Sequence, residues 1–283
     1  MLERNIGATG GNGFVGSAVF DGDVLRPTSS EVNILDIDQI RAFIKKNKIT
    51  TLVHAAAHTN VAKAKEEWER VKKINGEGTK NVAMACSEFD VRMVLISSDF
   101  IFPGTTRDRG PYSENSRRPE SFTSIGLGPY GSSKLLAEYL AEKNCSRLSI
   151  VRISYPFGLA DPNKDYLLKL TNRVKSGGSI FSDQNLTATY LPDLAVGLNA
   201  IIDQDLNGIF HIATSLTTPL DMMKYAVSRL GLSCEIKVGS CTDYLANPKV
   251  EPIPQYGGLD CTITQEQIGK KFHAWREAIE EIV

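Results

Sequence analysis

Short apolar runs alternate with segments of helical periodicity along most of this chain, and this alternation limits the possible folds more than any other feature. Residues 92–96 and 148–153 are apolar runs typical of buried strands, whereas 37–47 carries its apolar residues at helical spacing. Strands are predicted at residues 5–9, 23–26, 51–54, 92–96, 148–153 and 209–212, and helices at 37–47, 62–85, 130–143, 165–175, 192–202 and 219–230. Strands joined by helices form right-handed crossovers, so the pattern predicts an α/β fold with a parallel sheet covered on both faces.

The pattern changes after Gly158, where helices are separated by shorter strands. A chain of 283 residues suits one large domain or one domain with a smaller lobe. We therefore expect residues 1–158 to form mainly the first domain and 159–283 mainly a smaller lobe interleaved with it. Segments 103–129 and 246–258 are rich in Gly, Pro and Ser, which predicts surface loops.

Composition and charge exclude several classes of protein. A formal net charge of −1 gives no electrostatic reason to expect nucleic acid or an anionic membrane as a partner. No run of about 18 apolar residues predicts a membrane span, and a glycine cluster follows the first residues so closely that we expect no signal peptide. The 5 cysteines lack paired spacing and the 4 histidines lack ligand spacing. We therefore expect reduced thiols, no metal and a cytoplasmic protein.

A glycine cluster lies between the first predicted strand and the helix after it, with glycines at Gly10, Gly13 and Gly16. Diphosphate binding needs a tight turn without side chains and free N–H groups at the positive end of a helix. The spacing differs from Gly-x-Gly-x-x-Gly, and a glycine-rich turn without a ligand is the alternative interpretation. Because the cluster follows the first strand of an alternating chain, we expect it to bind a dinucleotide.

A second group of residues combines Tyr130, Lys134 and Ser98. A tyrosine and a lysine four residues apart on a helix share one face, and a nearby ammonium favours the phenolate, which suits acid–base chemistry. The pair alone is more often an exposed helix pair. Ser98, however, ends an apolar strand, where open α/β sheets bind their ligands.

The glycine turn, the strand-end serine and the Tyr-x-x-x-Lys pair together resemble the extended short-chain dehydrogenase/reductase superfamily and, within it, the dTDP-4-dehydrorhamnose reductase family. Residues 97–104, for example, look like the family's Ser-Thr-Asp-Tyr-Val-Phe-Asp-Gly signature. The segments that carry the resemblance are residues 35–37, 54–59, 74–81, 97–104, 152–158, 183–184, 189–195, 259–260 and 275–278. They follow the family's order over almost the full chain.

The resemblance implies a Rossmann-type doubly wound parallel sheet, with the cofactor and the catalytic residues mainly in 1–158, and a smaller C-terminal substrate-binding lobe. It implies cofactor contacts for Gly10, Gly13, Phe14, Val15, Gly16, Asp36, Ile37, Ala55, Ala56, Ala57, Tyr130 and Lys134. It implies substrate contacts for Ser98, Asp99, Phe100, Tyr155, Asp183, Gln184 and Thr189. The implied partner is a nucleotide-sugar, and family members often form homodimers.

The implied reaction is hydride transfer from a nicotinamide to the 4-keto group of a nucleotide-linked deoxysugar, in deoxysugar and polysaccharide biosynthesis. Tyr130 would donate the proton to the carbonyl oxygen, and Ser98 would orient that oxygen. Lys134 would hold the nicotinamide ribose and lower the pKa of Tyr130. Asn75 would hold a relay water.

Arg26 indicates which nicotinamide cofactor is used, because the end of the second strand faces the adenosine ribose in this fold. An acidic residue there favours NAD, whereas a guanidinium can bind a 2′-phosphate through two hydrogen bonds. Arg26 is followed by hydroxyls at Thr28, Ser29 and Ser30, although Glu31 lies close by. We therefore predict that NADP(H) is preferred over NAD(H).

The sequence departs from the family pattern where the substrate is expected. Ser98 replaces threonine, Tyr155 replaces tryptophan, His58 replaces tyrosine, and residues 185–188 replace a stretch containing Gly and Pro. The reaction type is therefore predicted more firmly than the sugar. Residues 25–31 also resemble GDP-fucose synthases, so an epimerase/reductase of that kind is one alternative.

A different class of function is a non-catalytic, NADP-binding regulatory subunit, since the regulatory subunit of methionine adenosyltransferase resembles these reductases. The intact set of Ser98, Tyr130 and Lys134 argues against it. A nucleotide-sugar dehydratase would need a glutamate directly after Asp99, but Phe100 stands there, so dehydration is disfavoured.

Overall fold

The computed structural model describes residues 5–19, 24–123, 126–158, 161, 163–231 and 234–283. Its main sheet is parallel and contains, in spatial order, β1 (Ile6–Thr9), β2 (Thr51–His54), β3 (Arg92–Ser98), β4 (Leu148–Ile153) and β6 (Gly208–His211). Every residue of β1, β2, β3 and β4 is buried, as expected for a sheet covered on both faces. The predicted doubly wound parallel sheet is confirmed.

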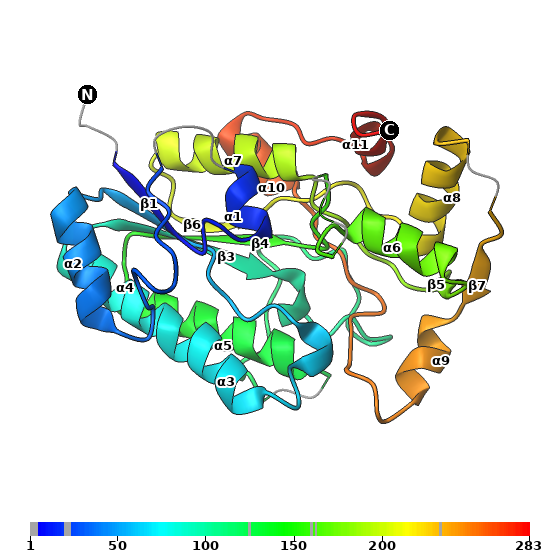
Figure 1. Ribbon diagram of the computed structural model, residues 1–283, viewed down its shortest axis with the longest axis horizontal. Helices are drawn as coiled ribbons and strands as arrows, with labels where there is room; N and C mark the ends of the chain where they lie inside the picture. Colours follow the sequence, from blue (N-terminus) through cyan, green and yellow to red (C-terminus); the bar gives the residue numbers. More distant parts are fainter. Residues whose placement is uncertain (1–4, 20–23, 124–125, 159–160, 162, 232–233) are drawn as a thin grey trace.

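Helices pack on both faces of this sheet (Figure 1). On one face lie α2 (Ile37–Asn47), α4 (Thr79–Glu88) and α5 (Pro129–Asn144), and on the other lie α1 (Phe14–Val19), α7 (Leu191–Asp203) and α10 (Thr262–Ile268). Two apolar clusters fill the layers: one joins the strands to α7 and the other joins them to α2 and α4. The second half of the chain therefore contributes β6, α7 and α10 to the main sheet and its cover.

A smaller lobe lies beyond the carboxyl end of the sheet, on the right of Figure 1. It contains a two-stranded parallel sheet of β5 (Ser179–Phe181) and β7 (Lys237–Gly239), with α6 (Tyr166–Lys175), α8 (Pro219–Arg229) and α9 (Cys241–Ala246). A separate apolar cluster holds this lobe together and includes Trp275 of α11 (Trp275–Glu280). None of the described helices is long and apolar enough to cross a bilayer.

The chain reverses its winding direction at β1, and this reversal positions the site. On one side of β1, Gly7 forms a single parallel bridge to Leu25; on the other side, β1 pairs with β2 along its length. The predicted strand at 23–26 is thus reduced to one bridge, and Asp23 lies outside the described residues. In open α/β sheets, such a reversal opens a crevice at the carboxyl ends of the strands, where ligands bind.

Three sequence expectations need correction. The helix predicted at 62–85 is divided into η1 (Val61–Lys63), α3 (Trp68–Lys72), the π-helical turn η2 (Lys73–Gly78) and α4. The loops at 103–129 and 246–258 are not wholly on the surface. Tyr112 is buried and stacks on Phe102, with ring centroids 4.0 Å apart, and Gln255 of the second loop is buried as well.

Candidate active site

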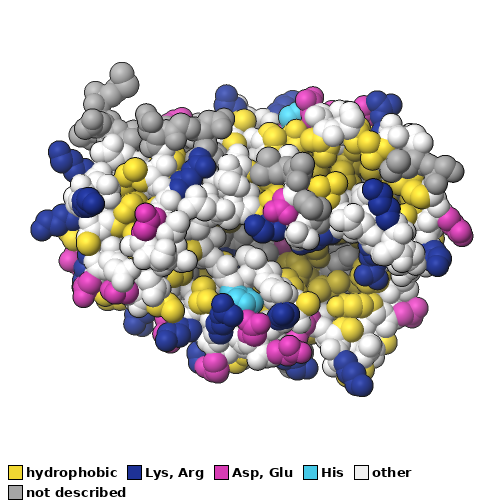
Figure 2. Space-filling model, viewed as in Figure 1, with side chains coloured by type: hydrophobic (Ala, Val, Ile, Leu, Met, Phe, Trp, Pro, Cys, Tyr) yellow, Lys and Arg dark blue, Asp and Glu magenta, His cyan; other side chains and the backbone are white. Residues whose placement is uncertain are grey.

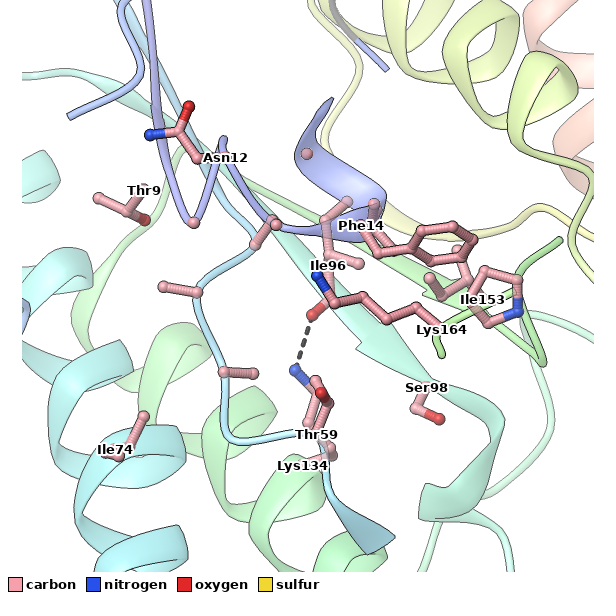
Figure 3. Close-up of a pocket in the computed structure, with 18 of the residues that line it drawn as sticks. Thr9, Asn12, Phe14, Thr59, Ile74, Ile96, Ser98, Lys134, Ile153 and Lys164 are labelled. Atoms are coloured by element: carbon pink, nitrogen blue, oxygen red, sulfur yellow. Dashed lines mark hydrogen bonds between the residues drawn. The ribbon is translucent and has the colours of Figure 1, made fainter. Parts of the chain in front are cut away.

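A cleft of about 940 Å³ follows the carboxyl ends of the strands and reaches the lobe. Figure 2 shows this face hollowed near its middle, and Figure 3 shows side chains of the cleft from both the sheet and the lobe. One wall carries the glycine turn, the centre carries Ser98, Tyr130 and Lys134, and the other wall carries Tyr155, Tyr166 and lysines of the lobe.

The glycine turn is fixed by its own packing. Gly10 has φ 72°, and a Cβ there would lie 2.4 Å from the backbone nitrogen of Ala56. A Cβ at Gly16 would lie 2.5 Å from the carbonyl oxygen of Gly10. Gly13 differs, because its Cβ would have one close neighbour, the Gly10 oxygen at 3.1 Å, and the residue borders the cleft. The fold itself therefore requires Gly10 and Gly16, whereas Gly13 keeps the backbone open to a ligand.

The floor of the same wall is made of small side chains. Ala55, Ala56 and Ala57 follow β2 and line the cleft. The backbone of Ala56 packs directly against Gly10, so any residue larger than glycine at position 10 would push the two segments apart. Phe14 and Val15, at the start of α1, line the cleft beside them. These predicted cofactor residues are thus brought together.

The three predicted catalytic residues also meet in this cleft. Ser98 ends β3, and Tyr130 and Lys134 lie on the first turns of α5. The Lys134 ammonium is buried and donates a hydrogen bond to the carbonyl oxygen of Ile96 at 2.7 Å, the dashed line in Figure 3. Burial lowers the pKa of Lys134 to about 8, although nearby Glu138 opposes this shift.

The predicted lowering of the Tyr130 pKa is wrong for this structure. Burial of the phenol, followed by the charge of Asp99, raises the pKa of Tyr130 to about 12, while a hydrogen bond with Ser98 acts in the opposite direction. The Lys134 ammonium is turned to the Ile96 carbonyl. Tyr130 is therefore a protonated phenol at neutral pH, which is the form that a proton donor needs.

Asp99 lies behind the cleft and does not line it. Its carboxylate accepts hydrogen bonds from the hydroxyls of Ser154 at 2.7 Å and Ser98 at 3.2 Å. Burial raises the pKa of Asp99 to about 7, although the hydrogen bonds from Ser154 and Ser98 oppose this shift. Asp99, predicted to contact the substrate, thus contacts Ser98, which lines the cleft.

Asn75 lies in the π-helical turn and is also outside the cleft lining. Its Oδ1 accepts from the backbone N–H of His58 at 2.7 Å, and its Nδ2 donates to the His58 carbonyl at 3.1 Å and to Ser133 Oγ at 2.8 Å. Both amide hydrogens are therefore used. The amide joins the wall segment at residue 58 to the catalytic helix α5.

A buried charge network fixes α5 to the sheet. Glu138 accepts hydrogen bonds from Arg152 Nε at 3.0 Å and Nη2 at 2.8 Å, and from Arg118 at 2.8 Å. Ser97 Oγ also donates to this carboxylate. Glu138 lies one turn after Lys134 on the same helix, so the network holds the catalytic helix against β3 and β4. Removing one partner of such a buried pair typically costs about 3–5 kcal/mol.

Several predicted binding residues lie elsewhere. Asp36 does not reach the cleft, because its carboxylate caps α2 by accepting from the N–H groups of Asp38 and Gln39. Ile37 packs in the apolar cluster under α2. The cleft is bordered instead by the residues just before them, namely Val32, Asn33, Ile34 and Leu35.

Of the lobe residues predicted to contact the substrate, some line the cleft and others lie behind it or elsewhere. Tyr155 lines the cleft, and Gln184 supports it from behind by donating to the Tyr155 hydroxyl at 3.0 Å. Asp183 instead accepts from the backbone N–H groups of Cys241 and Thr242 at the start of α9. Thr189 is fully buried and donates to the Ile212 carbonyl.

Arg26 lies beside the glycine turn but not in the cleft lining. A Cβ at Gly11 would lie 2.9 Å from Arg26 Cγ, and Asn12 donates to the Arg26 carbonyl at 3.1 Å. Thr28 and Ser29, which follow it, do line the cleft.

Sequence reasoning missed several lining residues. They are Thr9, Asn12, Pro27, Thr59, Val61, Ile74, Pro156, Lys164, Tyr166 and Lys169. Thr9 and Asn12 could have been found as neighbours of the glycine turn, whereas Lys164, Tyr166 and Lys169 belong to no recognised motif. The described residues contain no group of three or more His, Cys, Asp or Glu side chains placed to hold a metal.

Comparisons with known proteins agree with this geometry. Residues 4–283 match the family model described as RmlD substrate binding domain. A dTDP-4-dehydrorhamnose reductase from Mycolicibacterium smegmatis is 28% identical over 100% of this chain and 86% of its own length. The spore coat polysaccharide biosynthesis protein SpsK from Bacillus subtilis is 27% identical over 92% of this chain and 87% of its own.

Solved structures show the same fold. The crystal structure of dTDP-4-dehydrorhamnose reductase from Bacillus anthracis, in complex with NADP, superposes with a TM-score of 0.87 at 22% identity and covers 99% of both chains. The family model covers nearly the whole chain, and three of the predicted catalytic residues, Ser98, Tyr130 and Lys134, line the cleft. The chain therefore belongs to the RmlD substrate binding domain family, the family of the dTDP-4-dehydrorhamnose reductases.

Proposed function

We propose that this protein is an NADPH-dependent reductase of the 4-keto group of a nucleotide-linked 6-deoxysugar, acting in deoxysugar or polysaccharide biosynthesis. The observation that carries the proposal is the meeting of Ser98, Tyr130 and Lys134 with the glycine turn in one cleft. Relatives named dTDP-4-dehydrorhamnose reductase and a spore coat polysaccharide biosynthesis protein support the substrate class.

The cleft fits a nicotinamide dinucleotide. Gly13 leaves room for a diphosphate beside the start of α1, and Ala55, Ala56 and Ala57 provide a flat wall below it. When bound, the cofactor supplies the hydride for the carbonyl carbon. We assign residues 1–158 mainly to cofactor binding and catalysis, and 159–283 mainly to the substrate.

Tyr130 donates its proton to the carbonyl oxygen of the substrate, and Ser98 orients that oxygen toward Tyr130. Lys134 donates one of its three ammonium hydrogens to the Ile96 carbonyl, which leaves two to bind ribose hydroxyls. Asn75 acts chiefly as a positioning residue, because both of its amide hydrogens already bind protein groups and only one Oδ1 lone pair is left for a relay water.

NADPH is preferred over NADH in this proposal because Arg26 lies beside the cleft, and Thr28 and Ser29 line it, where the adenosine would bind. Arg26 lies against the glycine turn, and the two hydroxyl residues line the cleft. Glu31 is held nearby, its carboxylate accepting from the N–H and the hydroxyl of Thr28. These bonds hold the acidic group at Thr28.

The test is NADPH oxidation with a panel of dTDP-, UDP-, GDP- and CDP-linked 4-keto-6-deoxysugars, followed by identification of the product alcohol. Turnover with one nucleotide series supports the proposal. NADPH binding without turnover of any of these sugars would instead indicate the non-catalytic regulatory subunit.

A further inference from the structure

We propose that Lys164 and Lys169, on the lobe wall of the cleft, form an anion subsite that holds the diphosphate of the nucleotide-sugar. This inference rests on the proposed function and assigns its second substrate to particular side chains. Neither lysine belongs to a motif of the sequence analysis, and both line the cleft.

The charges of the cleft support an anionic ligand on both walls. Among the described residues that line it, Lys134, Lys164 and Lys169 are the charged ones, and none is Asp or Glu. Lys134 is buried at the strand ends and is engaged with Ile96. The other two lysines therefore leave positive charge on the lobe side with no acidic neighbour in the lining, which favours a polyanion there.

The two walls suit two different diphosphates. The glycine turn and the start of α1 form one wall, whereas Lys169 lies on α6, which Figure 1 shows on the lobe side with α8 and β5. The cofactor diphosphate is served by backbone N–H groups at the glycine turn. A second diphosphate on the lobe wall would use side chains, because no glycine-rich turn is among the described residues that line it.

A row of aromatic rings connects the catalytic tyrosine with this subsite. Phe100 lies 5.5 Å from Tyr130 and 5.7 Å from Tyr155 between ring centroids, and Tyr155 lies 4.7 Å from Tyr166. Lys169 follows Tyr166 by three residues on α6, so both side chains share one face of the helix. A sugar whose ketone meets Tyr130 would lie along these rings, and its anomeric diphosphate would point to the lysines.

Of the two lysines, Lys164 has an acidic partner among the described residues and Lys169 has none. Asp165, between the two lysines, accepts from the backbone N–H groups of Gly158 at 2.7 Å and Leu168 at 3.1 Å, and its side chain is buried. Lys164 lies 3.6 Å from Asp161 in an exposed pair, which is worth little. No ion pair to Lys169 is found among the described residues. Figure 3 shows the Lys164 side chain extended into the cleft.

Direct binding tests the subsite without turnover. With NADP present, calorimetry would measure the affinities of dTDP, UDP and GDP and of their monophosphates for the wild type, Lys169→Ala and Lys164→Ala. If Lys169 binds the diphosphate, Lys169→Ala should bind nucleoside diphosphates about tenfold more weakly, a loss of about 1.4 kcal/mol. The loss should be smaller for the monophosphate, smaller for Lys164→Ala, and largely restored in Lys169→Arg.

The matched control is Lys175→Ala, at the other end of α6, where the side chain is exposed and outside the cleft lining. It should leave every affinity unchanged, and thermal unfolding would confirm that all variants fold. Equal affinities in wild type and Lys169→Ala, or a loss confined to NADPH, would overturn the subsite. A wild type that binds none of the three diphosphates would overturn it as well.

Failure of the subsite and failure of the proposed function give different results. If sugars are turned over but Lys169→Ala leaves the KM for the sugar-nucleotide unchanged, only the subsite is wrong. If diphosphates bind through Lys169 but no ketone is reduced, only the reaction is wrong.

Discussion

The two walls of the cleft are built differently. The cofactor wall is made of backbone: glycines packed against Ala56 and small alanines, with little room for side chains. The lobe wall is made of side chains: Tyr155, Tyr166 and two lysines on the lobe, supported from behind by Gln184. A backbone wall leaves a motif in the sequence because only glycine or alanine fits there. A wall made of side chains leaves no such motif, since many residue types fit at its positions. Which of them is present alters the substrate that the wall can bind.

Tyr130, between the walls, should show the largest effect. Tyr130→Phe removes only the proton donor, and general acid catalysis contributes about 10²–10⁴-fold, so kcat should fall at least about 10²-fold while NADPH affinity persists. Steady-state kinetics and NADPH fluorescence would measure the two quantities. Tyr139→Phe, on the same helix with its hydroxyl bonded to Pro119, is the matched control and should keep its activity. Retention of more than about a third of wild-type kcat in Tyr130→Phe would refute the mechanism.

Gly13→Val tests whether the cofactor wall depends on backbone. The added side chain meets the Gly10 oxygen and enters the diphosphate space, so overpacking should cost about 2 kcal/mol, or roughly thirtyfold in the Kd for NADPH. Titration with NADPH measures this loss, and Gly13→Ala should give a smaller one. Nucleoside diphosphate affinity, which belongs to the lobe wall, should not change. A folded Gly13→Val protein with wild-type NADPH affinity would show that the turn binds no diphosphate.

Arg26→Ala tests the one charged side chain that we assign to the cofactor wall. The wild type should prefer NADPH over NADH at least tenfold in kcat/KM, about 1.4 kcal/mol, and the variant should lose most of this preference through a higher KM for NADPH. Arg229→Ala, on α8 of the lobe and half-exposed, serves as the control. Equal use of both cofactors by the wild type would contradict the assignment.

Asp99→Asn should have the smallest effect and a distinctive pH dependence. Asp99 is neutral below a pKa of about 7 and ionised above it, and its charge raises the pKa of Tyr130. Tyr130 then becomes a weaker acid, so kcat should fall severalfold as pH rises through about 7. The variant should lack this step and keep a second one near pH 8, where Lys134 loses its proton.

Ser154→Ala is the control for Asp99, because it removes a hydrogen bond that lowers the pKa of Asp99 but leaves the carboxyl in place. The step near pH 7 should move upward rather than vanish. Identical pH profiles of kcat for wild type and Asp99→Asn would remove Asp99 from the reaction.

The sequence predicted the sheet, most helices and the placement of Ser98, Tyr130 and Lys134 in one cleft, because these depend on local patterns. The strand predicted at 148–153 coincides with β4, and the α2 helix matches its predicted range. Asp36 could have been recognised as a helix cap, since an aspartate directly before a helical stripe commonly caps it. The helix predicted at 62–85 was too long because apolar spacing does not reveal a π-helical turn at Asn75.

Other misplacements depend on contacts between distant segments, which a single sequence does not show. The Asp183 carboxylate accepts hydrogen bonds from backbone N–H groups almost 60 residues away, at Cys241 and Thr242. Thr189 sits near motif residues in sequence but is enclosed by Ile212 and Ser154. Motif matching therefore located the segments of the lobe correctly and assigned some of their side chains to the wrong surface.

The absence of acidic side chains among the described lining residues bears on the direction of the reaction. The nicotinamide ring is neutral when reduced and carries a positive charge when oxidised, so NADPH is the more negative form. A cleft whose charged lining residues are lysines attracts NADPH more strongly than NADP⁺. NADP⁺ is still a polyanion, so the same field holds it, though less tightly than NADPH, and added salt should weaken this difference. Electrostatics thus favours binding of the reduced cofactor over the oxidised one before any bond is made.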